Sequence, residues 1–249
     1  LGASFFSDSA NHASLIDGMR LAKTPRFIYR HNDVTHLEEL LASCRGLRVI
    51  VSESVFSMDG DRAPLTDLVA IARRFDAILV IDEAHATGVF GRCGLGCLED
   101  VDASDVPLVT IHTGGKAIGG HGAFVLTSRA LRRVLVNRAR TFIYTTGLAP
   151  LQAMQLEFAL ASIIADSEPR KRIAGHMSRL NAVSQIVPII LGNNERVLKA
   201  QATLATLGYD VRAIRAPTVP AGSERLRVTL KSFHSAHHVH ALTRHLEQL

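Results

Sequence analysis

The chain has 249 residues, 47% of them hydrophobic and 20% charged, so it can bury a substantial core as one large domain or two modest ones. Its formal net charge of +5 comes from Lys and Arg spread along the sequence, with the densest group on a predicted surface helix at 129–140 that lacks interleaved aromatic residues. This pattern argues against a nucleic-acid-binding protein and leaves a solvated basic face or a docking surface for an acidic carrier or a phosphorylated substrate.

The sequence contains no run of about 18 apolar residues and no basic-then-apolar start, so we expect neither a membrane span nor export. The three cysteines, Cys44, Cys93 and Cys97, are too few and too scattered for a disulfide framework and fit a reducing compartment. We therefore expect a cytoplasmic protein.

Short apolar segments alternate with helical segments from the start of the chain. A strand-like beginning leads into a helix that opens at residues 11–14, where Asn11 is expected to cap the first amides. Further strands are predicted at 27–29, 47–51, 77–81, 107–111 and 122–126, and helices at 34–42 and 65–75. This alternation predicts an α/β fold with a mostly parallel sheet, whose ligands sit at the C-terminal strand ends.

The loops after these strands are rich in small and polar residues. The loop at 52–61 can bind an anion through its hydroxyls and Gly60, or simply form turns, and turns are favoured. Cys93 and Cys97 would need two more well-spaced ligands to hold a metal, and His85 and His112 are better explained otherwise. We expect no metal site here.

The composition shifts around residues 166–169, and we place a domain boundary there. Before it, Ser128 is expected to cap the arginine-rich helix, and a helix from 151 to about 165 is apolar nearly all round, so it should be buried or dimer-facing. The prediction is a large domain over 1–166 and a small α+β domain over 167–249.

The small domain reads as a basic helix, a strand at 187–190, a helix at 196–207, strands near 209–214 and 226–230, and a terminal helix. Its histidine-rich stretch at 233–240 could suggest a metal site. On a helix, however, His234, His237 and His238 share a face that can be plain solvent, and no carboxylate or cysteine joins them. A surface face is the favoured interpretation.

Two apolar runs end in chemically active side chains. The run at 77–81 is followed by Asp82 and His85, and the run at 107–111 by a glycine-rich loop with Lys116. A lysine and an aspartate at neighbouring strand tips suggest Schiff-base chemistry with pyridoxal phosphate. Taken alone, Lys116 could equally be a lysine that reaches water from a turn, and His12 a surface histidine at a helix start or a ring over a planar ligand.

Six motifs, in order along the chain, resemble the α-oxoamine synthases, which are pyridoxal-phosphate enzymes of fold type I. They are Asn-His-Ala-Ser at 11–14, His-Asn-Asp-Val-Thr-His-Leu at 31–37, Val-Phe-Ser-Met-Asp-Gly-Asp at 55–61, Asp-Glu-Ala-His-Ala-Thr-Gly at 82–88, Gly-Lys-Ala-Ile-Gly at 115–119 and Pro-Thr-Val-Pro-Ala-Gly-Ser-Glu-Arg-Leu-Arg at 217–227. Several motifs in register are far more specific than any one of them.

Within this family the sequence is most similar to the member that acts in biotin biosynthesis. The resemblance implies a cytoplasmic, homodimeric acyltransferase that condenses L-alanine with a pimeloyl thioester of acyl carrier protein or coenzyme A and releases carbon dioxide. Two alternatives remain: an α-oxoamine synthase that uses glycine or serine, and a non-catalytic partner or scaffold subunit of the same fold.

The resemblance also implies the roles of individual residues around the cofactor ring. Lys116 is the Schiff-base lysine, and Asp82 is the partner of the pyridine nitrogen. His12 stacks on the ring face, where it also meets substrate, and His85 hydrogen-bonds the ring oxygen.

Further contacts are implied around the phosphate and the substrate. Ser57 and Thr113 contact the cofactor, with Thr113 directed to the phosphate, and Thr145 and Thr146 stand where a neighbouring subunit's phosphate contact would be.

Two residues near the end of the chain are implied for the substrate. Thr218 and Arg227 handle it, with the arginine gripping the amino-acid carboxylate. The family also carries a segment before the histidine motif that supplies a glycine-containing phosphate contact, and we expect this sequence to lack it.

Overall fold

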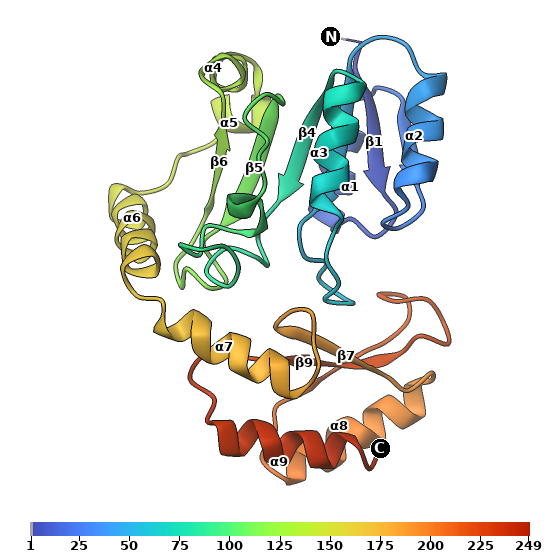
Figure 1. Cartoon of the computed structure of the whole chain (residues 1–249), viewed down its shortest axis with the longest axis vertical. Coiled ribbons are helices and arrows are strands. Elements are labelled where there is room, and N and C mark those ends of the chain that lie inside the picture. Colours follow the sequence, from blue (N-terminus) through green and yellow to red (C-terminus); the bar gives the residue numbers. More distant parts are fainter. Residues whose placement is uncertain (1) are drawn as a thin grey trace. The chain divides into compact units, whose positions relative to one another are not determined.

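The computed structural model describes residues 2–249, which divide into two compact units. The first holds the residues up to Phe56 together with Ala63–Ser167, and the second holds Ser57–Arg62 together with Glu168–Leu249 (Figure 1). The predicted boundary at 166/167 differs from this division in assigning residues 57–62 to the large domain and Ser167 to the small one.

The first unit is built on a six-stranded sheet. Its strands are β1 (Ser4–Asp8), β2 (Arg26–Tyr29), β3 (Arg48–Glu53), β4 (Ala77–Asp82), β5 (Leu108–Thr113) and β6 (Ala123–Thr127). Their order is β2-β1-β3-β4-β5-β6, and every pairing is parallel except that of β5 with β6. The predicted α/β fold with a mostly parallel sheet is confirmed.

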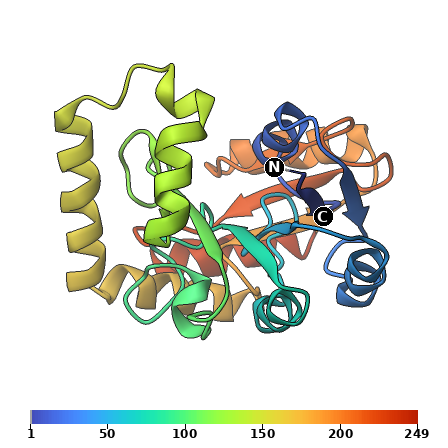
Figure 2. The ribbon, with the colours of Figure 1, turned by 90° about the horizontal axis from the view of Figure 1, so that it is seen from above.

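Helices cover both faces of this sheet. α1 (Ala13–Leu21) lies on one face, and α2 (Val34–Ser43) and α3 (Leu65–Arg74) lie on the other (Figure 2). Leu15 and Met19 of α1 pack against Val49 and Val51 of β3. Both faces of the central strands are therefore buried, as an apolar, uninterrupted strand sequence requires.

The start of α1 differs from the prediction, because His12 and not Asn11 is its N-cap. The Nδ1 atom of His12 accepts from the backbone N–H of Ser14. Asn11 is buried, and its amide donates to Ser7 Oγ and to the carbonyl of Val51, both at 2.9 Å. The side chain thus satisfies buried acceptors at the ends of β1 and β3, which outweighs capping an exposed helix end.

The rest of the first unit is more open. It contains a short 3₁₀ helix η1 (Cys97–Asp100) and the helices α4 (Arg129–Arg138), α5 (Arg140–Ile143) and α6 (Pro150–Ala165). Ser128 caps α4 as predicted, by accepting from the backbone N–H of Leu131. In the described chain, Leu156 is the one buried residue of α6. The expectation that this helix is buried is therefore wrong, and the alternative that it faces a dimer partner stays a prediction.

The second unit is a small α+β arrangement. Its antiparallel sheet has the order β7-β9-β8, with β7 (Ile186–Ile190), β8 (Arg212–Ile214) and β9 (Arg225–Thr229). Its helices are α7 (Glu168–Arg179), α8 (Asn194–Thr206) and α9 (Ala236–Leu246). Leu204 of α8, Leu226 of β9 and Val239 of α9 share one core. No helix within residues 2–249 is long and apolar enough to cross a membrane.

Candidate functional site

Four parallel strands of the first unit end at the same edge of the sheet, and each end carries a polar residue. His12 follows β1, and Glu53, Asp82 and Thr113 are the last residues of β3, β4 and β5. β1 lies between β2 and β3, so the strand order reverses there. Ligands of open α/β sheets bind at such a reversal, outside the carboxyl ends of the strands.

Asp82 stands near the middle of this edge. Its side chain is buried, and Oδ1 accepts from the backbone N–H of Ala84 at 2.8 Å. Burial raises the pKa of Asp82, whereas this hydrogen bond and the charges of Lys116 and His12 act in the opposite direction. The structure therefore brings three predicted site residues, Asp82, Lys116 and His12, within electrostatic reach of one another.

Lys116 is presented by the loop between β5 and β6. Two backbone hydrogen bonds of 2.8 Å, from Gly120 N to Gly114 O and from Gly114 N to Gly122 O, fix the loop. Lys116 itself is exposed, and a Cβ placed on Gly115 would meet no atom within 4 Å. A lysine on a fixed loop beside open space can be reached by a ligand.

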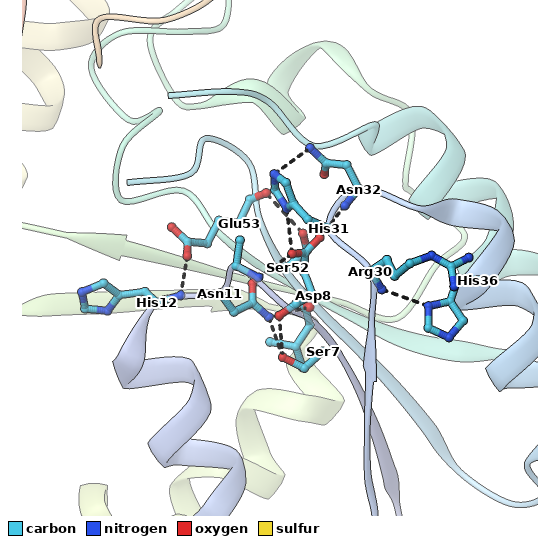
Figure 3. Close-up of polar contacts among 12 residues, drawn as sticks. Ser7, Asp8, Asn11, His12, Arg30, His31, Asn32, His36, Ser52 and Glu53 are labelled. Atoms are coloured by element: carbon cyan, nitrogen blue, oxygen red, sulfur yellow. Dashed lines mark hydrogen bonds and ion pairs between the residues drawn. The ribbon is translucent and has the colours of Figure 1, made fainter. Parts of the chain in front are cut away.

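Glu53 is a further member of this group that the sequence analysis missed. It lies directly opposite Asp82 in the β3–β4 register, is 2% exposed, and accepts the backbone N–H of His12 at 2.5 Å (Figure 3). Burial, followed by repulsion from Asp82, raises its pKa to about 8. The available signal was its position after an apolar strand, the same signal that identified Asp82.

A second carboxylate, Asp8, supports the neighbouring end of β1. Asp8 accepts from His31 Nδ1 at 2.8 Å and from the backbone N–H groups of Ala10 and Asn32, at 2.8 and 2.9 Å (Figure 3). The His31 ring meets Phe56 edge-on at 4.4 Å between centroids. These contacts tie the loop after β2 to the end of β1 and so shape one side of the candidate site.

The hydroxyl of Thr113 provides a test of whether the site suits pyridoxal phosphate. Thr113 Oγ1 is buried and has no hydrogen-bond partner among the residues that the structure describes. An unused buried donor near an exposed lysine and a buried carboxyl suits a phosphorylated ligand with a cationic ring nitrogen. The donor set present therefore fits this cofactor.

The two histidines nearest these strand ends differ. His85 is half-buried in the turn after β4. His112 is bonded to Thr87 Oγ1 at 2.8 Å and to Thr110 Oγ1 at 2.9 Å, and burial lowers its pKa. Neutral and fully engaged, His112 is a structural residue.

Thr145 and Thr146 lie in the exposed segment between α5 and α6. Among the described residues, the groups that act on the Asp82 carboxyl are Ala84, Lys116 and His12, and neither threonine is one of them. The structure therefore does not bring them into the group described above.

Three predicted residues belong to the second unit. Arg227 donates from Nε to the carbonyl of Ser57 at 2.6 Å and from Nη1 to Thr229 Oγ1 at 3.2 Å, and burial lowers its pKa. Thr218 is exposed between β8 and β9. The structure thus brings Arg227 and Ser57 together within this unit, and leaves Thr218 apart from them in its polar contacts.

A pocket of about 600 Å³ lies within the second unit and includes Arg227, Lys231, His234 and His238 in its lining. α9 begins at Ala236, so His234 precedes the helix on which it was predicted. The described part of the chain contains no group of three or more His, Cys, Asp or Glu side chains that could hold a metal ion.

Comparison with known proteins gives one matching family. The family described as aminotransferase class I and II matches residues 2–246. Among curated proteins, the 8-amino-7-oxononanoate synthase of Bordetella petrii is 45% identical over 99% of this chain, and that of Ralstonia pickettii is 41% identical over 97%. The chain spans 66% and 63% of the lengths of these two relatives.

Solved structures show the same fold. Serine palmitoyltransferase of Sphingomonas wittichii superposes with a TM-score of 0.93 at 28% identity, over 99% of this chain and 66% of that one. The 8-amino-7-oxononanoate synthase of Francisella tularensis gives 0.84 at 26% identity, over 99% and 75% of the two chains. Another serine palmitoyltransferase structure, at 26% identity, contains pyridoxal phosphate.

Proposed function

Because the chain belongs to the class I and II aminotransferase family, we propose that it binds pyridoxal phosphate and condenses L-alanine with a pimeloyl thioester to 8-amino-7-oxononanoate, a step of biotin biosynthesis. Carbon dioxide and the free carrier, acyl carrier protein or coenzyme A, are the other products. The observation that supports this most directly is the grouping of Asp82, Lys116 and His12 at the C-terminal strand ends. The identity of 41–45% to synthases of this name supports the choice of reaction.

The bound cofactor supplies an electron sink for the carbanion that forms when the Cα–H bond of alanine breaks. Asp82 in its ionised form would keep a proton on the pyridine nitrogen. Lys116 would hold the cofactor covalently, and its amine would take the Cα proton of bound alanine. His12 would support the ring face, and His85 would hydrogen-bond the ring oxygen.

The remaining roles are proposals that follow the family resemblance. Thr113 is assigned to the phosphate, in keeping with its unused buried hydroxyl, and Ser57 to the cofactor. Thr145 and Thr146 are assigned to the cofactor phosphate of a neighbouring subunit.

Substrate binding is assigned to Thr218 and Arg227. The planar guanidinium of an arginine can grip the amino-acid carboxylate with two parallel hydrogen bonds. We further propose that the two compact units are the predicted large and small domains.

A homodimer is proposed as the working form, because apolar side chains crowd the exposed surface of α5, α6 and the segment between them. Leu151 and Phe158 are each 76% exposed, and Tyr144 is 73% exposed. An apolar surface of this kind on a protein marks an interface. A second copy of the chain is its proposed occupant.

The deciding experiment is an absorption spectrum of the chain mixed with pyridoxal phosphate. We expect a new absorption band, and borohydride treatment should attach the cofactor covalently to Lys116. Peptide mass spectrometry would locate the modified residue. K116A should show no such product. A wild-type chain that gives no fixed product would contradict the catalytic proposal and favour the non-catalytic partner or scaffold.

The second candidate is an α-oxoamine synthase that uses serine or glycine. The close superposition on serine palmitoyltransferase, with a TM-score of 0.93, favours serine as this alternative. Titration of the cofactor-loaded chain with L-alanine, L-serine and glycine separates the candidates, since the true substrate should shift the spectrum at the lowest concentration. A response to serine at lower concentration than alanine would reject the alanine assignment.

A further inference from the structure

The carboxyl of Glu53 lies at the candidate site, yet the reaction proposed above gives it no role. It ends β3 directly opposite Asp82 and is almost wholly buried. A buried carboxyl costs free energy through lost hydration unless its surroundings compensate for that loss. Its contacts therefore show what it does.

Glu53 contacts the backbone of His12. The N–H of His12 donates to Glu53 Oε1 at 2.5 Å (Figure 3). On its other side, the His12 ring bonds Ser14 Oγ through Nδ1 at 2.8 Å. His12 is exposed and begins α1, where its carbonyl accepts from the backbone N–H groups of Leu15 and Ile16. The hydrogen bond to Glu53 adds a contact that joins this helix start to the end of β3.

The charges around Glu53 determine its protonation. Asp82 of β4 and Asp8 of β1 repel its ionised form, while Lys116 and the His12 N–H favour it, and burial outweighs both to give a pKa of about 8. Two neighbouring buried carboxyls do not both ionise readily. Asp82 has the N–H of Ala84 as well as Lys116 and His12 to favour its ionised form. A pKa of about 8 places the proton on Glu53 at neutral pH.

We propose that Glu53 is a positioning residue, whose buried carboxyl accepts the backbone N–H of His12 and holds this residue at the strand ends beside Asp82. It thereby fixes the place of the His12 imidazole. The link to a cofactor rests on the proposed function, whereas the hydrogen bond and the protonation do not.

The first test follows the His12 amide by NMR in the whole chain without cofactor. Labelling with ¹⁵N-histidine reduces the backbone signals to the 12 histidines of the sequence. Between about pH 6 and pH 9.5, the wild-type His12 amide should shift with a midpoint near 8. E53Q keeps an acceptor oxygen but cannot titrate, so its His12 amide should stay protected from exchange and show no midpoint.

E53A should give the opposite result to E53Q in amide exchange. In E53A the His12 amide loses its acceptor and should exchange about tenfold faster or more. E39Q, which changes an exposed glutamate of α2, is the matched control and should behave as wild type. A midpoint near 8 that persists in E53Q, or an unchanged amide exchange rate in E53A, would overturn the proposal. Loss of amide protection in E53Q would overturn it as well.

Cofactor affinity provides an independent reading. At neutral pH, E53Q should bind pyridoxal phosphate within about twofold of wild type, and E53A about tenfold more weakly. If E53A does not fold, the NMR comparison of wild type with E53Q still tests whether Glu53 is the group that titrates at the His12 amide. If no variant binds the cofactor, the proposed function fails, and the His12 amide continues to report on Glu53 alone.

Discussion

At the scale of single residues, Asp82 provides the most direct test of the proposed chemistry. D82N keeps the shape of the side chain but removes the anion that keeps the pyridine nitrogen protonated. We expect exchange of the alanine Cα proton in D₂O, measured by NMR, to slow about a hundredfold or more. D67N, an exposed aspartate of α3, is the control. Unchanged exchange in D82N would remove Asp82 from the mechanism.

The buried carboxyls also make stability depend on pH. Burial raises the pKa values of Glu53, Asp82 and Glu83, that of Glu53 from 4.5 to about 8. The folded chain then binds protons more tightly than the unfolded chain, so the free energy of unfolding falls as pH rises from about 4.5 through about 8.

Urea unfolding at about pH 6 and about pH 9 tests this dependence. The wild-type midpoint should be lower at the higher pH. The urea midpoint of E53Q should fall less than that of wild type between the two pH values. It should still fall somewhat, because Asp82 and Glu83 remain. An equal loss in wild type and E53Q would contradict the raised pKa of Glu53.

The sequence predicted Asp82 and Lys116 as a pair, because each follows an apolar run that ends abruptly. Glu53 escaped prediction because Ser52-Glu53-Ser54 has the composition of a turn, although β3 extends through Glu53. The cap of α1 was assigned to Asn11 for a similar reason. Local preference favours asparagine at a helix start, but here the side chain of Asn11 hydrogen-bonds the carbonyl of Val51, 40 residues away in the sequence.

At the scale of elements, the loop after β4 depends on one glycine. Glu83 accepts from Ser54 Oγ at 2.6 Å and from the backbone N–H groups of Cys97 and Leu98, at 3.1 and 2.8 Å. Gly96 approaches this carboxyl so closely that an added Cβ would lie 2.7 Å from it, and its φ of +120° suits glycine alone. Glu83 thus anchors the loop, and Gly96 makes room for it.

G96A should therefore lower the stability of the chain by about 1–3 kcal/mol, seen as a lower melting temperature. G18A is the matched control, since a Cβ at this helical position of α1 would meet no atom within 4 Å. It should leave the melting temperature unchanged or raise it slightly. Equal melting temperatures for G96A and wild type would disprove the close packing at Glu83.

The strands of the first unit were predictable because their apolar runs are short and bounded by turn residues. The antiparallel direction of β6 was not, since an apolar run carries no sign of its direction. The apolar composition of α6 was equally ambiguous, because a sequence does not say what covers a helix. Its exposure in the structure keeps the dimer-facing interpretation as a proposal.

At the scale of the whole molecule, the exposed apolar surface predicts self-association. We expect light scattering after size exclusion to give the mass of a dimer, and F158R to shift it toward the monomer, because a charge would have to be buried. L21R is the matched control, since Leu21 of α1 is also 72% exposed but lies outside this surface. A monomeric wild type, or a dimer that L21R disrupts as strongly as F158R does, would refute the proposed interface.

The path of the backbone between the two units has a consequence for how they are joined. Residues 57–62 belong to the second unit although both of their flanks belong to the first, so the chain passes between the units at 56/57, 62/63 and 167/168. Arg225 pairs with Asp59 and Arg227 with the Ser57 carbonyl, so this short excursion supplies partners to β9. A proteolytic nick at 167/168 therefore divides the second unit between two fragments, because residues 57–62 stay on the N-terminal fragment. The released C-terminal fragment would lack the partners that Ser57 and Asp59 supply to β9.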